Sequence, residues 1–354
     1  MVLDVGTHLS IDPDRIYTAG LSGGARVATQ LALSGMSKGV IACSAGFPTS
    51  DNIPNRVPFA FFGTAGTEDF NYAELKRLDN ELDDRGAAHR IVIFEGGHEW
   101  ASAALLTDAV EWLELQGMRT GAWSRDDALI QAALKSRVAA VESMTGGETW
   151  VEMKLIAADF KGLVDTGEYE RRAKELAASR VVKDWRKAER LLAIREDDLV
   201  AKLAELGRGV SESKIRRTAE DLRRKAEAPD DSAERRMARR AIGSVAISVR
   251  ENVRTLFDQQ SYGEASSLLA LFAALRPGQA RTYYDLARAR AFARETKSAL
   301  DALAQAAGAG FSDATRVEAE PAFARLKNEP AFQAALAAIR ANPASSVPPS
   351  PAHP

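Results

Sequence analysis

The sequence predicts an α/β unit with a parallel sheet of about four strands, followed by an all-α helical-repeat module. Up to about residue 116, short apolar runs alternate with amphipathic segments, as in parallel strands joined by helical crossovers. Past Gly117 the strand pattern ends, and helical periodicity continues to about Arg340. The charge changes at the same place: residues 1–116 carry 8 Lys and Arg against 16 Asp and Glu, whereas the remainder carries 39 against 33.

The length of 354 residues is enough for about two domains with cores of their own. We predict the α/β unit over residues 1–117, a helical region or connector over 118–250, and helical repeats over 251–340. The last residues, 341–354, are rich in Pro and Ser and are expected to form a disordered tail.

Four strands are expected, at residues 15–19, 39–47, 57–63 and 89–95. The segments after the first, third and fourth strands each place apolar residues on one helical face. These faces consist of Val27, Ala28, Leu31 and Ala32, of Tyr72, Leu75, Leu78 and Leu82, and of Leu105, Leu106, Ala109, Val110 and Leu113. Because helices connect the strands, the strands are expected to be parallel. The only cysteine, Cys43, lies in an apolar run, which favours a buried strand position over a reactive thiol.

The helical part contains an internal repeat with a period of 34 residues. Its members are Ala265 and Leu269 on one helix, Pro277 in the closing turn, Leu286 on the next helix, and Ala299 and Leu303 on the helix after it. This spacing resembles that of tetratricopeptide repeats, which pair two helices in 34 residues. The pattern departs at Phe311, where a second proline is usual, and at Asn252, where an apolar residue is usual. The resemblance implies that this part has a surface for a protein partner.

Charge and hydropathy exclude several classes of function. The surplus of six positive charges after residue 116 is dilute and interleaved with acidic residues, which argues against a nucleic-acid partner. The segment 213–240, dense in Arg and Glu, is interpreted as a long solvent-exposed helix or connector in preference to a binding tract. No apolar run is long enough to cross a bilayer, and a secretion signal is not visible, so a cytoplasmic location is expected for the sequence as written.

The strongest candidate for chemistry is Ser22, in Gly20-Leu21-Ser22-Gly23-Gly24. The motif follows a predicted strand and precedes a predicted helix, which is the context of a serine nucleophile on a strand-to-helix turn. Its glycines are expected to let the strand and the helix approach each other closely. Outside that context the same five residues also occur in ordinary turns.

A serine hydroxyl needs a base, and the base needs a group that orients it. Of the four histidines, His98 in Gly96-Gly97-His98-Glu99-Trp100 follows the last strand, at the carboxyl edge of the sheet, where sites in open α/β sheets lie. The other three are expected to be non-catalytic: His89 as a surface residue at the opposite edge, His8 ahead of the first strand, and His353 in the tail.

Two carboxylates follow the third strand, and we choose Asp69 over Glu68 as the orienting group. The shorter side chain of Asp69 suits a fixed hydrogen bond to imidazole. Capping of the helix that starts near Tyr72 is an alternative role for either residue.

The order Ser22, Asp69, His98, together with the Gly-rich loops around the last two, resembles the catalytic half of α/β-hydrolases of the esterase and polyhydroxybutyrate-depolymerase-like group. The resemblance covers about residues 8–116 and implies a serine hydrolase of small-molecule or polymeric carboxylic esters. In this family Ser22 would attack the ester, His98 would take its proton, Asp69 would hold the imidazole, and the N–H of Gly23 would be one oxyanion donor. No metal, nucleotide or redox cofactor is implied.

The family resemblance also implies further strands before the one that carries Ser22. Only fourteen residues precede Arg15, and residues 1–10 resemble the end of a helix leading into that strand. The sequence is therefore expected to begin within a domain, with impaired activity as one consequence and a secreted or periplasmic location as another if the natural start lies upstream. Two alternatives stay open: a protein-interaction module with an inactive hydrolase remnant, and a peptidase of the prolyl-oligopeptidase type.

Overall fold

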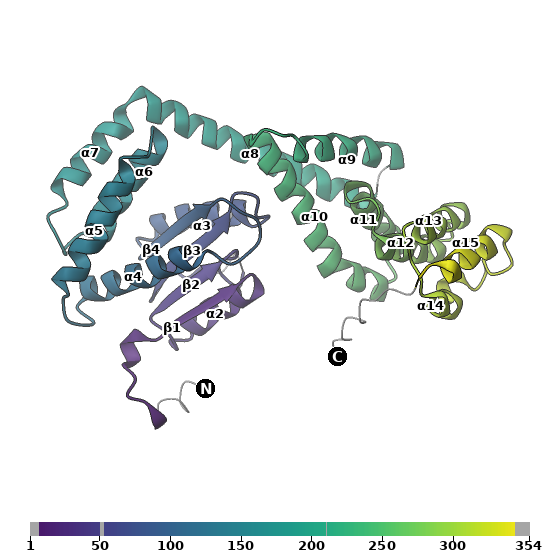
Figure 1. The fold of residues 1–354 in the computed structure, drawn as a ribbon, viewed down its shortest axis with the longest axis horizontal. Coiled ribbons are helices and arrows are strands. Elements are labelled where there is room, and N and C mark those ends of the chain that lie inside the picture. Colours follow the sequence, from purple (N-terminus) through teal and green to yellow (C-terminus); the bar gives the residue numbers. More distant parts are fainter. Residues whose placement is uncertain (1–6, 50–52, 210, 344–354) are drawn as a thin grey trace. The chain divides into compact units, whose positions relative to one another are not determined.

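The computed structural model describes residues 7–49, 53–209 and 211–343 (Figure 1). Its internal contacts divide the chain into two compact units, residues 1–195 and 196–354. The division falls within the long helix α8 (Arg180–Arg208). Residues 1–6 and the tail from residue 344 onward, which includes His353, lie outside the described residues.

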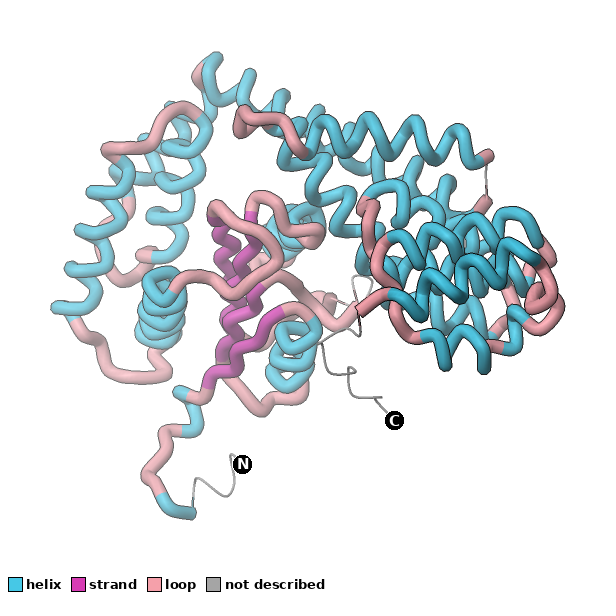
Figure 2. The backbone as a smooth tube through the Cα atoms, turned by 45° about the vertical axis from the view of Figure 1, so that its right-hand side comes forward, coloured by secondary structure: helices cyan, strands magenta, loops and turns pink. Residues whose placement is uncertain are grey.

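The first unit contains a four-stranded parallel sheet, as predicted (Figure 2). Its strands β1 (Tyr17–Leu21), β2 (Gly39–Cys43), β3 (Ala60–Gly66) and β4 (His89–Phe94) are neighbours in chain order. β2 ends four residues before the predicted end, and β1 and β3 begin two and three residues later than predicted. β1 begins late because Pro13–Arg15 form a 3-10 turn capped by Asp12. β3 begins late because Pro58 has no N–H for the ladder, although Phe59 is already buried.

Helices cover both faces of the sheet. α2 (Gly23–Leu33) and α3 (Tyr72–Asp84) pack on one face, and α4 (Ala103–Thr120) packs on the other. Of the four apolar residues that helical spacing grouped in α2, Ala28 and Ala32 are buried and Val27 and Leu31 are exposed. α2 buries small residues, Ala25, Ala28, Thr29 and Ala32. Val110 of α4 is likewise exposed, and Trp112 is buried in that face. Cys43 is fully buried, as predicted.

Between α4 and α8 the first unit contains the helices α5 (Asp127–Val141), α6 (Gly147–Asp159) and α7 (Gly167–Ala178). α5 and α6 share a core with the end of α4. A buried polar cluster also joins α6 to the sheet and to α4. Asp159 of α6 accepts hydrogen bonds from Trp112 Nε1 (2.7 Å) and Arg137 (2.8 Å) and pairs with Arg90 of β4 (3.3 Å). Because these groups are largely buried, each charge in the cluster needs its partners.

The second unit is helical throughout its described residues. Its helices after α8 are α9 (Glu212–Ala226), α10 (Ala233–Asp258), α11 (Tyr262–Leu275), α12 (Ala280–Phe292), α13 (Thr296–Gly308), α14 (Ala314–Ala319) and α15 (Pro330–Ala341), with a 3-10 turn at Pro321–Phe323. The interpretation of residues 213–240 as one long exposed helix is wrong. The segment turns between α9 and α10, and it buries Ile215, Ala219 and Leu222 in a shared core.

The repeat residues lie on consecutive packed helices. Ala265 and Leu269 lie on α11, Leu286 on α12, and Ala299 and Leu303 on α13, all in one core. The two departures from the repeat pattern have structural reasons. Phe311 stacks on Tyr284 with ring centroids 4.5 Å apart, so its ring closes the core after α13. Asn252 is exposed and bonds the Ser248 carbonyl of its own helix, so its position needs no apolar side chain.

Candidate active site

Ser22 lies on a sharp turn between β1 and α2. Its φ of 56° and ψ of −121° place a non-glycine residue in a strained region of backbone space. Its N–H donates to the Cys43 carbonyl at 2.8 Å, and its own carbonyl accepts the N–H groups of Ala25 and Arg26 in α2. The sequence context and the backbone conformation are those of a serine nucleophile on a strand-to-helix turn.

Gly20 is the glycine that this turn requires. A Cβ on Gly20 would lie 2.2 Å from the backbone C and O of Gly24 and 2.6 Å from the nitrogen of Ala25. A Cβ on Gly23 or Gly24 would meet nothing within 4 Å. The close approach of strand and helix was expected for the motif as a whole, and the structure assigns it to the first glycine.

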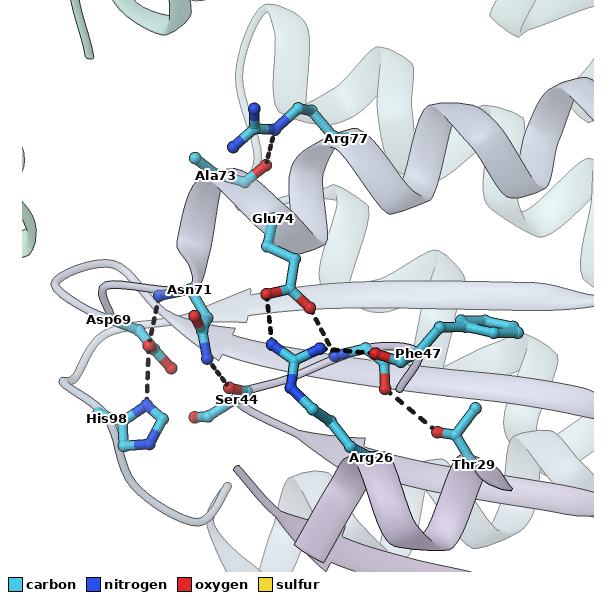
Figure 3. Close-up of polar contacts among 11 residues, drawn as sticks. Arg26, Thr29, Ser44, Phe47, Asp69, Asn71, Ala73, Glu74, Arg77 and His98 are labelled. Carbon is cyan, nitrogen blue, oxygen red and sulfur yellow. Dashed lines mark hydrogen bonds and ion pairs between the residues drawn. The ribbon is translucent and has the colours of Figure 1, made fainter. Parts of the chain in front are cut away.

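Asp69 and His98 are brought together from the loops after β3 and β4 (Figure 3). His98 Nδ1 lies 2.9 Å from Oδ1 of Asp69. The Asp69 side chain is fully buried, whereas the His98 side chain is 24% exposed. A buried carboxylate on Nδ1 fixes the imidazole so that Nδ1 carries the hydrogen and Nε2 is the nitrogen left to accept a proton.

The loops that carry these two residues are fastened to each other. The N–H of Thr67 donates to the Phe94 carbonyl at 2.8 Å, and the N–H of Glu68 donates to the Gly96 carbonyl at 2.9 Å. A Cβ on Gly66 would lie 2.3 Å from the Gly97 carbonyl oxygen, so a glycine is needed for the loops to meet. Main-chain contacts therefore set the separation of Asp69 and His98.

Asp69 lies two residues before Asn71, the cap position of α3, and bonds the turn that leads into the helix in place of capping it. Its Oδ1 accepts the N–H of Asn71 at 2.8 Å, and its carbonyl accepts the N–H of Tyr72 at 2.9 Å. Within the described residues, its buried Oδ2 has no hydrogen-bond partner. The turn and the imidazole thus share one carboxylate oxygen.

Phe70 covers one face of the imidazole. Its ring stacks on His98 with centroids 4.1 Å apart and planes 28° apart. Together with the Asp69 bond at the edge of the ring, this contact restricts rotation of the imidazole. Sequence reasoning missed Phe70, because an aromatic residue next to an acidic one has no local pattern that marks it as part of a site.

The other histidines lie apart from this cluster. His8 is exposed, and His89 begins β4. The prediction of His89 as a surface residue is wrong, because its side chain is only 7% exposed and Nε2 lies 3.3 Å from Oδ1 of Asp79. Burial lowers the pKa of His89, but the hydrogen bonds to Asp79 and the Ala87 carbonyl and the nearby charges outweigh it, and the pKa is raised.

Ser22 and His98 do not bond directly in this structure. Among the described residues, the Ser22 hydroxyl has no hydrogen bond. The two residues belong to the same sheet edge, because each follows the carboxyl end of a parallel strand. Catalytic hydrogen bonds are often formed only when substrate binds.

Within the described residues, no group of His, Cys, Asp and Glu side chains is placed to hold a metal ion. No helix in the same part of the chain is both long and apolar enough to span a membrane.

Comparisons of the chain with protein-family models, with curated proteins and with solved structures give no match.

Proposed function

We propose that this protein is a serine hydrolase that acts on carboxylic esters, with Ser22 as nucleophile, His98 as general base and Asp69 as the orienting acid. The observation that carries the proposal is the 2.9 Å contact between His98 Nδ1 and the fully buried Asp69 carboxylate. It is supported by the strained turn at Ser22, at the same edge of the sheet. A buried carboxylate on Nδ1 is the arrangement by which a triad acid orients the imidazole and stabilises the imidazolium that forms.

In the proposed reaction, Ser22 Oγ attacks the ester carbonyl while His98 Nε2 takes its proton. The negative charge on the carbonyl oxygen is met by the N–H of Gly23, at the start of α2. His98 then gives the proton to the leaving alcohol, which breaks the ester bond and leaves an acyl group on Ser22. Water, deprotonated by the same imidazole, releases the carboxylic acid and restores the serine.

The arrangement of the strands supports the proposed family, the α/β-hydrolases of the esterase and polyhydroxybutyrate-depolymerase-like group. The three residues follow the first, third and fourth strands of a parallel sheet whose spatial order equals its chain order. Chain order of nucleophile, acid and base agrees with that of this superfamily. A peptidase of the prolyl-oligopeptidase type has the same chain order of nucleophile, acid and base. Substrates with an alcohol leaving group and substrates with an amine leaving group must therefore be compared directly.

A fluorophosphonate probe tests the proposal. The full chain is expected to be labelled on one serine, and Ser22→Ala, Asp69→Asn and His98→Gln are expected to lose the label. Ser34→Ala is the matched control, because Ser34 is an exposed serine at the end of α2. Equal labelling of wild type and Ser22→Ala contradicts the proposal. Hydrolysis of p-nitrophenyl esters, but not of peptide p-nitroanilides, separates an esterase from a peptidase.

The helix pairs of the second unit favour a second candidate function, binding of a protein partner. α10 packs on α11 and α12 packs on α13, as in helical-repeat proteins that use such pairs for recognition. If binding is the whole function, the chain is not labelled by the probe at Ser22, and a partner is retained equally by wild type and Ser22→Ala. Labelling at Ser22 without any retained partner contradicts this candidate.

A further inference from the structure

We propose that Ser44 and Asn71 are positioning residues that hold His98 in its working orientation through a closed ring of hydrogen bonds. The inference rests on the proposed function, because the ring matters only if His98 is the base. Figure 3 shows the bonds from His98 to Asp69, from Asp69 to Asn71 and from Asn71 to Ser44. The Ser44 hydroxyl bonds the carbonyl of Glu99, the residue after His98, so the peptide bond between His98 and Glu99 closes the ring. Three loops, after β2, β3 and β4, are tied together in this way.

Asn71 makes two of the hydrogen bonds in this closed ring, one to Asp69 and one to Ser44. Its backbone N–H donates to Oδ1 of Asp69 at 2.8 Å, the oxygen that also bonds His98. Its side-chain Nδ2 donates to the Ser44 carbonyl at 2.6 Å. Asn71 occupies the position before α3, where an Asn side chain ordinarily caps the helix, but it makes no capping bond here. Its side chain is therefore used to hold the loop after β2.

Ser44 joins that loop to the loop of His98. Its side chain is fully buried, its N–H donates to the Thr64 carbonyl at 2.7 Å, and its hydroxyl donates to the Glu99 carbonyl at 3.2 Å. Its φ of 58° lies in the left-handed region that glycine adopts most readily. A serine at this position retains backbone strain, and its side chain places a hydroxyl within hydrogen-bond distance of the Glu99 carbonyl.

The loop of His98 is supported on both sides of the histidine. Before His98, the Gly96 carbonyl accepts the N–H of Glu68. The Ser44 hydroxyl fixes the main chain directly after the imidazole, and Asp69 fixes the ring itself. The contacts with the loop after β3 act before and at His98, whereas the Ser44 hydroxyl is the contact that holds the main chain just after it, so we expect its loss to let the imidazole shift.

Asn71→Ala and Ser44→Gly in the full chain test the inference. Ser44→Gly removes the hydroxyl and also relieves the left-handed strain, so it is the variant expected to keep the fold. We expect the rate of fluorophosphonate labelling to fall about tenfold to a hundredfold, as for a displacement approaching 1 Å at a reacting group. In NMR spectra of ¹⁵N-histidine-labelled protein, assigned with His98→Gln, the hydrogen-bonded Nδ1 proton of His98 should broaden or disappear.

Two matched controls make the same kinds of bond away from the site. Asn80 of α3 donates its side-chain amide to the Lys76 carbonyl at 2.9 Å, and Ser34 donates its hydroxyl to the Leu31 carbonyl at 2.7 Å, both in exposed positions. Asn80→Ala and Ser34→Ala are expected to keep the wild-type labelling rate and the His98 resonance. Thermal unfolding of all four variants identifies any that lose the fold.

The outcomes separate this inference from the proposed function. If folded Ser44→Gly and Asn71→Ala keep the wild-type labelling rate and the Nδ1 resonance, the positioning role is overturned and the hydrolase proposal stands. If wild type is not labelled, the hydrolase proposal fails and the positioning role fails with it, whatever the spectra show. Slow labelling together with loss of the resonance in folded Ser44→Gly supports the inference.

Discussion

Substitution of Gly20 by alanine is the most direct test of the turn at Ser22. The new Cβ would lie 2.2 Å from the backbone C and O of Gly24, where ordinary contact begins at 3.4 Å. The obstacle is backbone and no rotamer change relieves it, so β1 and α2 must separate by roughly 1 Å. Forced overpacking of this kind lowers the free energy of unfolding by about 1–3 kcal/mol. A shift of roughly 1 Å at Ser22 is expected to slow its reaction about a hundredfold.

Two assays measure these effects. Urea unfolding followed by circular dichroism reports the stability, and the rate of fluorophosphonate labelling reports the reactivity of Ser22. Gly24→Ala is the control, because its Cβ meets no neighbouring atom and Gly24 lies within α2. Alanine in a helix is more stable than glycine by roughly 0.5–1 kcal/mol, so this variant should be at least as stable as wild type.

The steric role of Gly20 is refuted if Gly20→Ala unfolds and reacts as wild type does. It is also refuted if Gly24→Ala loses as much stability as Gly20→Ala, because the steric argument distinguishes the two glycines. Loss of reactivity without loss of stability would show that the turn yields locally, with the strain carried by Ser22 itself.

Three further variants test packing and charge away from Ser22. Arg137→Met removes one cation from the buried carboxylates of Glu152 and Asp159, so urea unfolding should show a loss of about 3 kcal/mol in the free energy of unfolding. Arg171→Ala, in an exposed ion pair, is the control and should lose almost none. Equal losses in the two variants would contradict the burial of the cluster. The pKa of His89 is raised in the folded protein, so its contribution to stability is complete below pH 6.5 and is lost as the pH rises through its pKa in the folded state. The urea midpoint of the wild type should therefore fall more steeply above pH 6.5 than that of His89→Gln. Phe311→Ala removes a buried ring stacked on Tyr284 and should lower the free energy of unfolding, measured by calorimetry, by about 3–5 kcal/mol. A loss near zero would show that the stack does not close the core.

The number and direction of the strands and the position of Ser22 could be predicted from the sequence, because they depend on local signals. Alternating apolar runs identify strands, amphipathic crossovers make them parallel, and a glycine motif between a strand and a helix identifies the turn. The same rules placed Asp69 and His98 after the third and fourth strands. Their contact at 2.9 Å is a property of the folded chain.

The burial of a side chain could not be predicted from the sequence where it depends on how closely helices and strands pack. Val27 and Leu31 have helical spacing and are nevertheless exposed, because α2 approaches the sheet through small residues. His89 was expected at the surface, but α3 provides Asp79 to pair with it. Neither the neighbour nor its distance is visible in a local pattern.

The sequence by itself determined the parallel sheet, the helical second part and the order of the candidate catalytic residues, since these follow from periodicity, turn chemistry and strand direction within short segments. Only the tertiary structure decided which side chains meet: Asp69 with His98, Asn71 with Ser44, and Asp159 with Trp112. These pairs are 27 to 47 residues apart in the chain. Contacts over such separations form because packing of the strands and helices brings distant loops to one edge of the sheet and distant helices side by side, and that packing is a property of the whole core.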